Sequence, residues 1–201
     1  MTKFLLIRHA TTDAVGKSLS GRQPGIHLND QGKLEAAALA NRLSDLKISA
    51  IYSSPLERAI QTATPLAGLH NLICNVNNYF QELDFGSWTN KPFSELANDQ
   101  VFKRFNSFRS GTRIPGGEMM QEAQSRIVQG LEKLATNHPG ETIAVVSHSD
   151  MIKSAVAFYT GMHIDLMQRL EISPASVSVL DVYPDFASLQ LLNHCGNFMI
   201  L

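Results

Sequence analysis

Two short apolar runs without polar alternation constrain the fold of this chain most strongly. They occupy residues 4–7 and 142–147, and a charged or polar residue follows each run at once. A half-exposed strand alternates apolar and polar residues, whereas a strand of a parallel sheet covered by helices on both faces reads as a continuous apolar run. The two runs therefore predict central strands of a parallel sheet.

Predicted helices alternate with predicted strands along the chain. Asn29 can cap a helix whose apolar residues recur at spacings of three and four, and the segment from Met120 to Leu134 carries a second stripe of this kind. Pro65 should end or kink the last turn of a helix between them. The predicted elements are strands at 4–7, 50–53, 142–147, 176–183 and 187–194 and helices at about 30–46, 55–69, 120–134 and 150–161. This order predicts an α/β fold, a three-layer α/β/α sandwich with a mostly parallel central sheet.

The chain is predicted to form one domain over residues 1–201. It has no internal repeat and no linker-like stretch, and 44% of its 201 residues are hydrophobic, which is enough for a sizeable core. Residues 83–114 are rich in aromatic and polar residues with only weak helical periodicity. We expect this segment to be an insertion that crosses over the sheet.

Composition excludes several classes of function. Seventeen Lys and Arg against eighteen Asp and Glu give a net charge of −1, which excludes nucleic-acid binding through bulk charge. No apolar run is long enough for a signal-peptide core or a membrane span, which predicts a soluble, cytoplasmic protein. Cys74 and Cys195 form no CxxC, the histidines show no metal-ligand spacing, and neither GxxxxGK[ST] nor GxGxxG occurs. We therefore expect no metal ion, no cofactor, no nucleic-acid partner and no membrane partner.

Polar clusters follow three of the predicted parallel strands, at residues 8–12, 53–58 and 148–150. The carboxyl ends of parallel strands meet at one edge of a sheet, and open α/β sheets bind ligands there. Two arginines and two histidines should meet at this edge: Arg8, Arg58, His9 and His148. Because guanidinium groups match the oxygens of a doubly charged tetrahedral anion, the clusters predict a site for a phosphoryl group.

A neutral histidine in such a cage can attack phosphorus in line while the arginines neutralise the equatorial oxygens. His9, which follows Arg8 directly, is the candidate nucleophile. The leaving alkoxide needs a proton, and a water molecule must later be activated, so one carboxylic acid with a pKa near neutrality is required. Glu82 is the best-placed candidate, and Asp84 competes with it.

The motifs that carry these residues resemble those of the histidine phosphatase superfamily, also called the phosphoglycerate mutase-like family. The resemblance extends over nearly the whole chain. The similar segments are residues 6–9, 21–32, 53–63, 82–88, 115–118 and 145–148. The resemblance implies a phosphoglycerate mutase-like fold, a largely parallel sheet flanked by helices.

The resemblance also implies a role for each matched residue. His9 corresponds to a nucleophile that becomes phosphorylated, and Arg8, Arg58 and His148 correspond to the phosphate pocket. Glu82 corresponds to an acid that first donates a proton and then acts as a base.

Other positions match the family less closely. Thr12 fits a position whose hydroxyl binds phosphate, and Arg22 and Ser149 are further candidates for substrate contacts. Ala10 stands where glycine is usual, as does Ser149, and Val15 stands where many members carry an asparagine that reaches the phosphate. One phosphate donor of the family is therefore expected to be missing.

These residues predict a metal-independent phosphomonoesterase, a phosphoric monoester hydrolase similar to the histidine acid phosphatases, which hydrolyses a small phosphorylated metabolite through a phosphohistidine. The family's mutases are longer and use basic residues of the insertion to hold the substrate carboxylate. The shorter insertion of this chain favours hydrolysis over return of the phosphoryl group, although it contains five basic residues: Lys91, Lys103, Arg104, Arg109 and Arg113.

Three alternatives remain open at this stage. They are a phosphoglycerate mutase, a phosphohistidine phosphatase acting on protein, and a non-enzymatic sensor of a phosphate ligand. A sensor would need neither the nucleophile nor the acid, and a protein phosphatase would favour an open site with short loops. Sugar phosphates, phosphoglycerates and nucleoside-like phosphates all remain compatible substrates, and the sequence does not determine whether the chain forms a homodimer.

Overall fold

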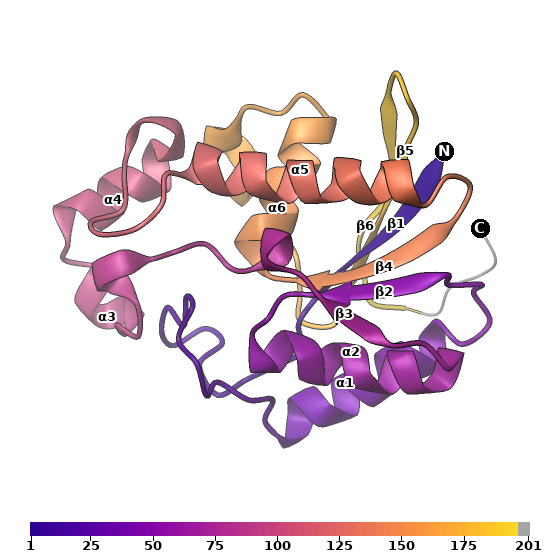
Figure 1. Cartoon of the computed structure of the whole chain (residues 1–201). Helices are drawn as coiled ribbons and strands as arrows, with labels where there is room; N and C mark the ends of the chain where they lie inside the picture. Colours follow the sequence, from indigo (N-terminus) through magenta and orange to yellow (C-terminus); the bar gives the residue numbers. More distant parts are fainter. Residues whose placement is uncertain (197–201) are drawn as a thin grey trace.

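A six-stranded sheet in the order β3-β2-β4-β1-β5-β6 forms the centre of the computed structural model, which describes residues 1–196 (Figure 1). The first four strands in the chain pair in parallel, and β5 and β6 join the sheet antiparallel. The strands are β1 (Thr2–Arg8), β2 (Ala50–Ser53), β3 (Cys74–Val76), β4 (Thr142–Ser147), β5 (Val177–Val182) and β6 (Ala187–His194). The predicted α/β fold with a mostly parallel sheet is therefore confirmed.

The apolar run at residues 4–7 is buried from both sides. Its side chains alternate between two cores: Phe4 and Leu6 pack into one, and Leu5 and Ile7 into the other. None of the four is more than 1% exposed. The absence of polar alternation in the sequence thus reflects helices on both faces of β1.

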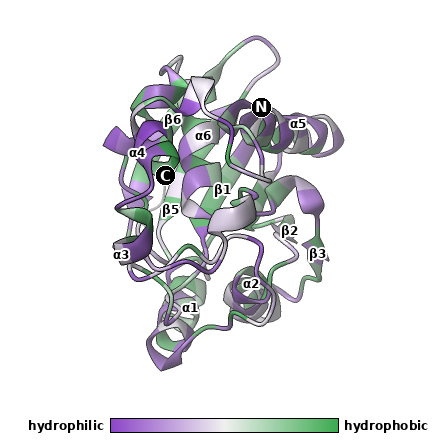
Figure 2. Ribbon diagram, turned by 90° about the vertical axis from the view of Figure 1, so that its left-hand side faces the viewer, coloured by the Kyte–Doolittle hydropathy of each residue, from purple (hydrophilic) through white to green (hydrophobic). Residues whose placement is uncertain are grey.

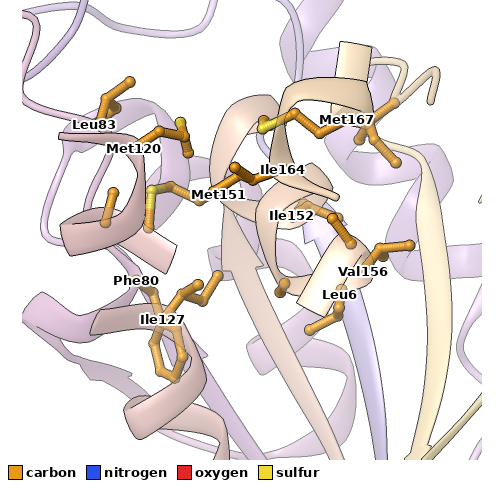
Figure 3. Close-up of a cluster of buried hydrophobic side chains, with 14 of the residues drawn as sticks. Leu6, Phe80, Leu83, Met120, Ile127, Met151, Ile152, Val156, Ile164 and Met167 are labelled. Atoms are coloured by element: carbon orange, nitrogen blue, oxygen red, sulfur yellow. The ribbon is translucent and has the colours of Figure 1, made fainter. Parts of the chain in front are cut away.

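Two pairs of helices make these outer layers (Figure 1). The helices α1 (Asp30–Arg42) and α2 (Glu57–His70) cover the face of Leu5 and Ile7, and α5 (Met120–Asn137) and α6 (Ser149–Tyr159) cover the other. Figure 3 shows Leu6 on the second side, with Ile127 of α5 and Ile152 of α6. In Figure 2 the central strands are mostly hydrophobic, and hydrophilic residues gather on the surrounding helices.

Local signals set most helix ends. Asn29 caps α1 as expected, because its side chain accepts a hydrogen bond of 2.9 Å from the amide of Gly32. Pro65 lies inside α2 without ending it, so of the two expected effects, an end or a kink, the first is wrong, and the helix reaches the end predicted near residue 69. The helix continues to His70 because Leu66 and Ala67 beyond the proline are buried against the core, and packing of this kind outweighs one lost hydrogen bond. Asn71, with φ of 53°, ends it in the left-handed conformation.

Residues 83–114 lie beyond the edge of the sheet at which the strands β1, β2 and β4 end (Figure 1). The segment contains α3 (Phe93–Leu96), α4 (Gln100–Ser107) and two turns of 3₁₀ helix, Gly86–Trp88 and Arg109–Gly111. Trp88 is the packing centre of this segment. Its indole is 1% exposed and packs edge-on against Phe102 and Phe105, and its N–H donates to Asp99 at 3.0 Å.

The sequence did not predict the short elements. Edge strand β3 and the 3₁₀ helices Asn78–Phe80 and Ile164–Arg169 are too short for a periodic pattern. In the part of the chain that the structure describes, no helix is both long and apolar enough to cross a membrane.

Candidate active site

The ends of three neighbouring strands bring the predicted polar clusters together. Arg8 pairs in register with Ser147, and Ser53 pairs with Val146, so the chain leaves β1, β4 and β2 at one edge of the sheet. The rings of His9 and His148, the residues that follow β1 and β4, have centroids 5.2 Å apart. The edge therefore has the arrangement that parallel strands impose.

His9 is buried and has one fixed hydrogen bond. Its Nδ1 lies 2.8 Å from the carbonyl oxygen of Ala10. A carbonyl oxygen only accepts, so Nδ1 carries the hydrogen and Nε2 of the neutral ring keeps its lone pair. Burial holds the pKa of His9 well below 6.5, and the charges of Arg58 and Arg8 lower this pKa further. The geometry thus leaves His9 with an uncharged, nucleophilic Nε2 at neutral pH.

Arg58 occupies the first turn of α2 and is 1% exposed. Its Nη2 donates to the carbonyl oxygen of Gly21 at 2.8 Å. Its Nε and Nη1 are buried and have no acceptor among the described residues, and the same is true of Nε of Arg8. Leaving buried donors unsatisfied is costly, so these three N–H groups are suited to the oxygens of an anion.

His148 is fully buried between two partners. Nη2 of Arg58 lies 3.3 Å from its Nδ1, and Oγ of Ser54 lies 2.8 Å from its Nε2. Because a guanidinium only donates, Nδ1 accepts and Nε2–H donates to Ser54. Burial, followed by the charge of Arg58, keeps the pKa of His148 well below 6.5, so His148 is also uncharged at neutral pH.

Glu82 reaches the same site from outside the sheet. Its Oε1 accepts from the amide of Leu83 at 2.9 Å, and its Oε2 lies 3.7 Å from Nδ1 of His148. Burial raises the pKa of Glu82 to about 7, and the carboxylate of Asp150 adds to this rise, whereas Arg58 opposes it. Both protonation states of Glu82 are therefore populated near neutrality.

Asp84, the competing acid in the sequence, lies elsewhere. Its carboxylate accepts from the amide of Gly86 at 2.9 Å and lies 3.6 Å from Arg22. Asp84 does not line the cavity described below, whereas Glu82 does. The structure therefore favours Glu82 as the acid of this site.

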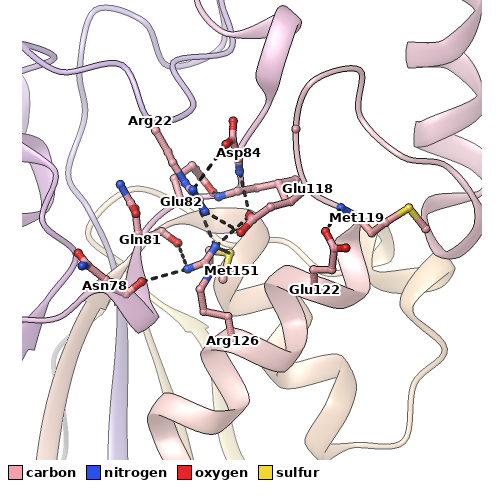
Figure 4. A network of polar contacts seen from close by, with 12 residues as sticks. Arg22, Asn78, Gln81, Glu82, Asp84, Glu118, Met119, Glu122, Arg126 and Met151 are labelled. Atoms are coloured by element: carbon pink, nitrogen blue, oxygen red, sulfur yellow. Dashed lines mark hydrogen bonds and ion pairs between the residues drawn. The ribbon is translucent and has the colours of Figure 1, made fainter.

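Arg22 lies behind Glu82 instead of lining the cavity (Figure 4). Its Nε donates to the carbonyl oxygen of Glu82 at 2.9 Å, and its Nη2 donates to Glu118 at 2.7 Å. Glu118 also pairs with Arg126 at 3.1 Å and accepts from the amide of Asp84 at 3.0 Å. Arg22, Glu118 and Arg126 thus form a cluster, here called the anchor, that holds the backbone of the Glu82 segment.

The sequence analysis did not assign Glu118 or Arg126 to the site. Residues 115–118 matched a family motif, which was a signal for Glu118, but only as the entry to a helix. Arg126 lies on α5 with no local motif, so its contact with the Glu82 segment appears only in three dimensions.

A cavity of about 170 Å³ opens at this edge of the sheet. Its wall includes Thr12, which is 3% exposed, and Ser149, the first residue of α6. The lining residues are Arg8, His9, Thr12, Ala14, Val15, Gly16, Ser18, Leu19, Ser20, Gly21, Arg58, Glu82, Phe85, Phe93, Ser149 and Asp150. The cavity is smaller than the usual range for drug-sized ligands, which favours a small substrate.

A buried ion pair ties residues 83–114 to the cavity wall. Arg109 is 3% exposed, its Nη1 lies 3.1 Å from Oδ2 of Asp150, and its guanidinium stacks 4.4 Å from the ring centroid of Phe105. The sequence analysis noted Arg109 only as a basic residue of the insertion.

Other basic side chains of this segment also contact their own neighbours. Lys91 pairs with Glu95 at 2.6 Å, Arg113 pairs with Glu122, and Arg104 lies over the ring of Phe108. No basic residue of 83–114 lines the cavity.

Within residues 1–196, no group of three or more His, Cys, Asp or Glu side chains is arranged to hold a metal ion. The unsatisfied N–H groups of Arg8 and Arg58 are suited to an anion that the two arginines neutralise.

Comparisons with known proteins identify similar chains. The family model described as "Histidine phosphatase superfamily (branch 1)" matches residues 4–194. A bifunctional protein of Mycobacterium tuberculosis is 33% identical over 97% of this chain and 54% of its own length, so the chain spans about half of that relative. Phosphoserine phosphatase 1 of Hydrogenobacter thermophilus is 28% identical over 100% of this chain and 97% of its own.

Solved structures share the fold. A phosphoserine phosphatase mutant from Entamoeba histolytica, in complex with phosphoserine, superposes with a TM-score of 0.88 and 26% identity, covering 99% of this chain and 100% of that one.

Proposed function

The chain belongs to branch 1 of the histidine phosphatase superfamily, as its motifs predict, and from this premise we propose that it hydrolyses a small phosphate monoester through a phosphohistidine at His9. Its phosphatase relatives support an enzyme that acts on phosphate esters. The observation that carries the specific proposal is the hydrogen bond from Nδ1 of His9 to Ala10, which leaves Nε2 unprotonated beside two arginines.

In the first step Nε2 of His9 attacks phosphorus, and the P–O bond to the alcohol breaks as the P–N bond forms. The guanidinium groups of Arg8 and Arg58 neutralise the equatorial oxygens. Protonated Glu82 gives its proton to the leaving oxygen, so the alcohol departs neutral and Glu82 becomes a carboxylate. The hydrogen bond from Nδ1–H of His9 to the carbonyl oxygen of Ala10 persists, and this oxygen stabilises the positive charge on the phosphorylated ring.

In the second step the Glu82 carboxylate takes a proton from water, whose oxygen attacks phosphorus as the P–N bond breaks. Inorganic phosphate leaves, His9 returns to its neutral form, and Glu82 is again protonated. A pKa of about 7 suits both tasks, because the acid form and the base form are both accessible at neutral pH. The scheme uses no metal ion.

The three alternatives have less support. A mutase would need cations that hold the substrate carboxylate, and no basic residue of 83–114 lines the cavity. A sensor would have no use for both a nucleophile and an acid. A phosphatase acting on protein would need an open site, whereas Phe85 and Phe93 of residues 83–114 form part of the cavity wall.

Hydrolysis of p-nitrophenyl phosphate in excess chelator tests the proposal. We expect turnover by the wild type, loss of turnover in His9→Ala, and a phosphohistidine in acid-sensitive, base-stable form after rapid quenching. His163→Ala is the matched control, because the His163 side chain is 66% exposed and does not line the cavity. Turnover that persists in His9→Ala would overturn the phosphohistidine, and phosphate binding without any turnover would favour the sensor.

A further inference from the structure

We infer that the alcohol portion of the substrate carries no carboxylate and no second phosphate, and is instead neutral or cationic with an apolar part. This inference rests on the proposed phosphatase function and names the substrate class of that site. It comes from the distribution of charge around the cavity.

Four charged or ionisable side chains besides His9 line the cavity: Arg8, Arg58, Glu82 and Asp150. The two arginines have unsatisfied buried N–H groups and are matched to the transferred phosphoryl group. Glu82 is the proposed acid. The remaining ionised group of the wall is the carboxylate of Asp150, which Arg109 pairs from outside the cavity.

Cations near the cavity are engaged by the protein. Nε of Arg22 bonds the Glu82 carbonyl and its Nη2 bonds Glu118, while Arg109 is paired with Asp150. Lys153 donates to Gln168 at 3.1 Å. Lys17 belongs to the loop that contributes Gly16 and Ser18 to the wall, but it is exposed and does not line the cavity. A carboxylate on the substrate would find no cation in the described wall beyond those that hold the phosphate.

The rest of the wall carries no charge. Val15, Leu19, Phe85 and Phe93 line the cavity together with Ala14, two glycines and four hydroxyl residues, Thr12, Ser18, Ser20 and Ser149. An anionic group moved from water into this wall would exchange its hydration for neutral hydroxyl donors, would gain no cationic partner and would approach the carboxylate of Asp150. A hydrocarbon portion would gain from burial, and an ammonium would gain from Asp150.

Two pairs of esters that differ in one carboxylate test the inference. Phosphoethanolamine is O-phosphoserine without its carboxylate, and glycerol 3-phosphate is 3-phosphoglycerate with the carboxylate replaced by a hydroxymethyl group. We expect kcat/KM for the carboxylate-free ester to exceed that of its partner by about tenfold or more in both pairs. Equal values, or a preference for the carboxylate esters, would overturn the inference.

Substitutions in the cavity wall test whether its charge causes this preference. Asp150→Asn removes the carboxylate and frees Arg109 to face an anion, so the preference should shrink. Asp185→Asn removes an exposed carboxylate from the β5–β6 turn and should leave the preference unchanged. Val15→Lys places a cation in the wall and should raise the relative kcat/KM of the carboxylate esters even if Asp150→Asn does not fold.

The outcomes distinguish a failure of the inferred substrate class from a failure of the proposed phosphatase function. Hydrolysis of p-nitrophenyl phosphate with no discrimination between the paired esters would leave the phosphatase standing and overturn the substrate class. If no ester is hydrolysed, the phosphatase proposal fails, and calorimetric Kd values for the same four esters test the charge preference on their own. Tighter binding of the carboxylate esters would then overturn it.

Discussion

Oε2 of Glu82 lies 3.7 Å from Nδ1 of His148, so the proposed acid lies beside the histidine predicted for the phosphate pocket, although of the two only Glu82 lines the cavity. The two residues reach this position from different parts of the fold. His148 follows a central strand, whereas Glu82 lies in the irregular segment between the 3₁₀ helices Asn78–Phe80 and Gly86–Trp88. The first predictions concern this acid and its surroundings.

Glu82→Gln should lower kcat for an alkyl phosphate by about a hundredfold or more, because general acid–base catalysis is lost in both steps. With p-nitrophenyl phosphate the leaving group needs little protonation, so the first step should persist. Rapid mixing should then show a burst of nitrophenolate close to one per active site, followed by slow turnover. Asp84→Asn is the matched control and should behave like the wild type. An unchanged kcat in Glu82→Gln would exclude Glu82 as the acid.

The pH profile of kcat/KM should be bell-shaped, with its maximum below pH 7. The scheme needs protonated Glu82, so activity should decrease as pH rises through about 7. It also needs neutral His9, whose pKa lies well below 6.5, so the acid limb should lie well below 6.5. Because Asp150 helps to raise the pKa of Glu82, Asp150→Asn should move the alkaline limb to lower pH. Asp185→Asn should not move it, and an unshifted limb in Asp150→Asn would contradict this coupling.

The free energy of unfolding should decrease as pH rises, because the pKa of Glu82 is raised in the folded state. The pKa of Glu82 is raised from 4.5 to about 7 in the folded state, so between these values the folded protein holds a proton that the unfolded chain has lost. This contribution is fully present below pH 4.5 and is lost as pH rises through about 7. Between pH 5 and 8.5 the wild type should lose about 2–3 kcal/mol of unfolding free energy relative to Glu82→Gln. Urea titrations of both proteins measure the difference, and parallel curves would contradict the raised pKa.

Arg22→Met should impair the acid without impairing phosphate binding. The anchor holds the backbone of Glu82, so its loss should lower kcat for an alkyl ester by about tenfold, as expected for a misplaced catalytic group. The Kd for inorganic phosphate should stay unchanged, because Arg22 does not line the cavity. Arg113→Met removes an exposed ion pair with Glu122 and serves as control. A weaker Kd for phosphate in Arg22→Met would instead indicate direct contact with the substrate.

Arg58→Met should abolish stabilisation by phosphate without a large loss of stability in the phosphate-free protein. The buried Nε and Nη1 of Arg58 have no acceptor in the described protein, whereas Nη2 bonds Gly21 and His148. Relief of the unsatisfied donors should offset the loss of these bonds, so Tm in phosphate-free buffer should change little. Phosphate at a hundred times its Kd should stabilise the wild type by about 2.7 kcal/mol, and this gain should vanish in the variant. Calorimetry in both buffers tests the prediction, and a phosphate-dependent Tm in Arg58→Met would refute it.

The sheet and the edge that carries the candidate site could be predicted because their signals are local. An unbroken apolar run identifies a doubly covered strand, and the residue after it lies at the carboxyl edge. This reasoning located His9 and His148 without any knowledge of their contacts. The two residues then meet because β1 and β4 are neighbours in the sheet.

The supports of the site could not be predicted because they depend on pairs that are distant in sequence. Arg109 meets Asp150 only once residues 83–114 fold back onto α6, and Arg126 meets the Glu82 segment only once α5 packs beside it. Neither contact leaves a periodic or motif-like signal. Pro65 shows the opposite case, in which a strong local signal yields to burial of the residues around it.

The anchor supports the Glu82 segment and not the residues at the ends of the central strands, so the two parts of the site can change independently in evolution. The proposed nucleophile and Arg8, the last residue of β1, depend on the central strands, whereas the proposed acid depends on three salt-bridged side chains outside the sheet. Substitutions in the anchor can therefore accumulate without unfolding the core. On the proposed scheme, a descendant that loses the anchor would keep the phosphate-binding groups and lose much of its turnover, so a ligand receptor lies only a few substitutions away from the proposed catalyst.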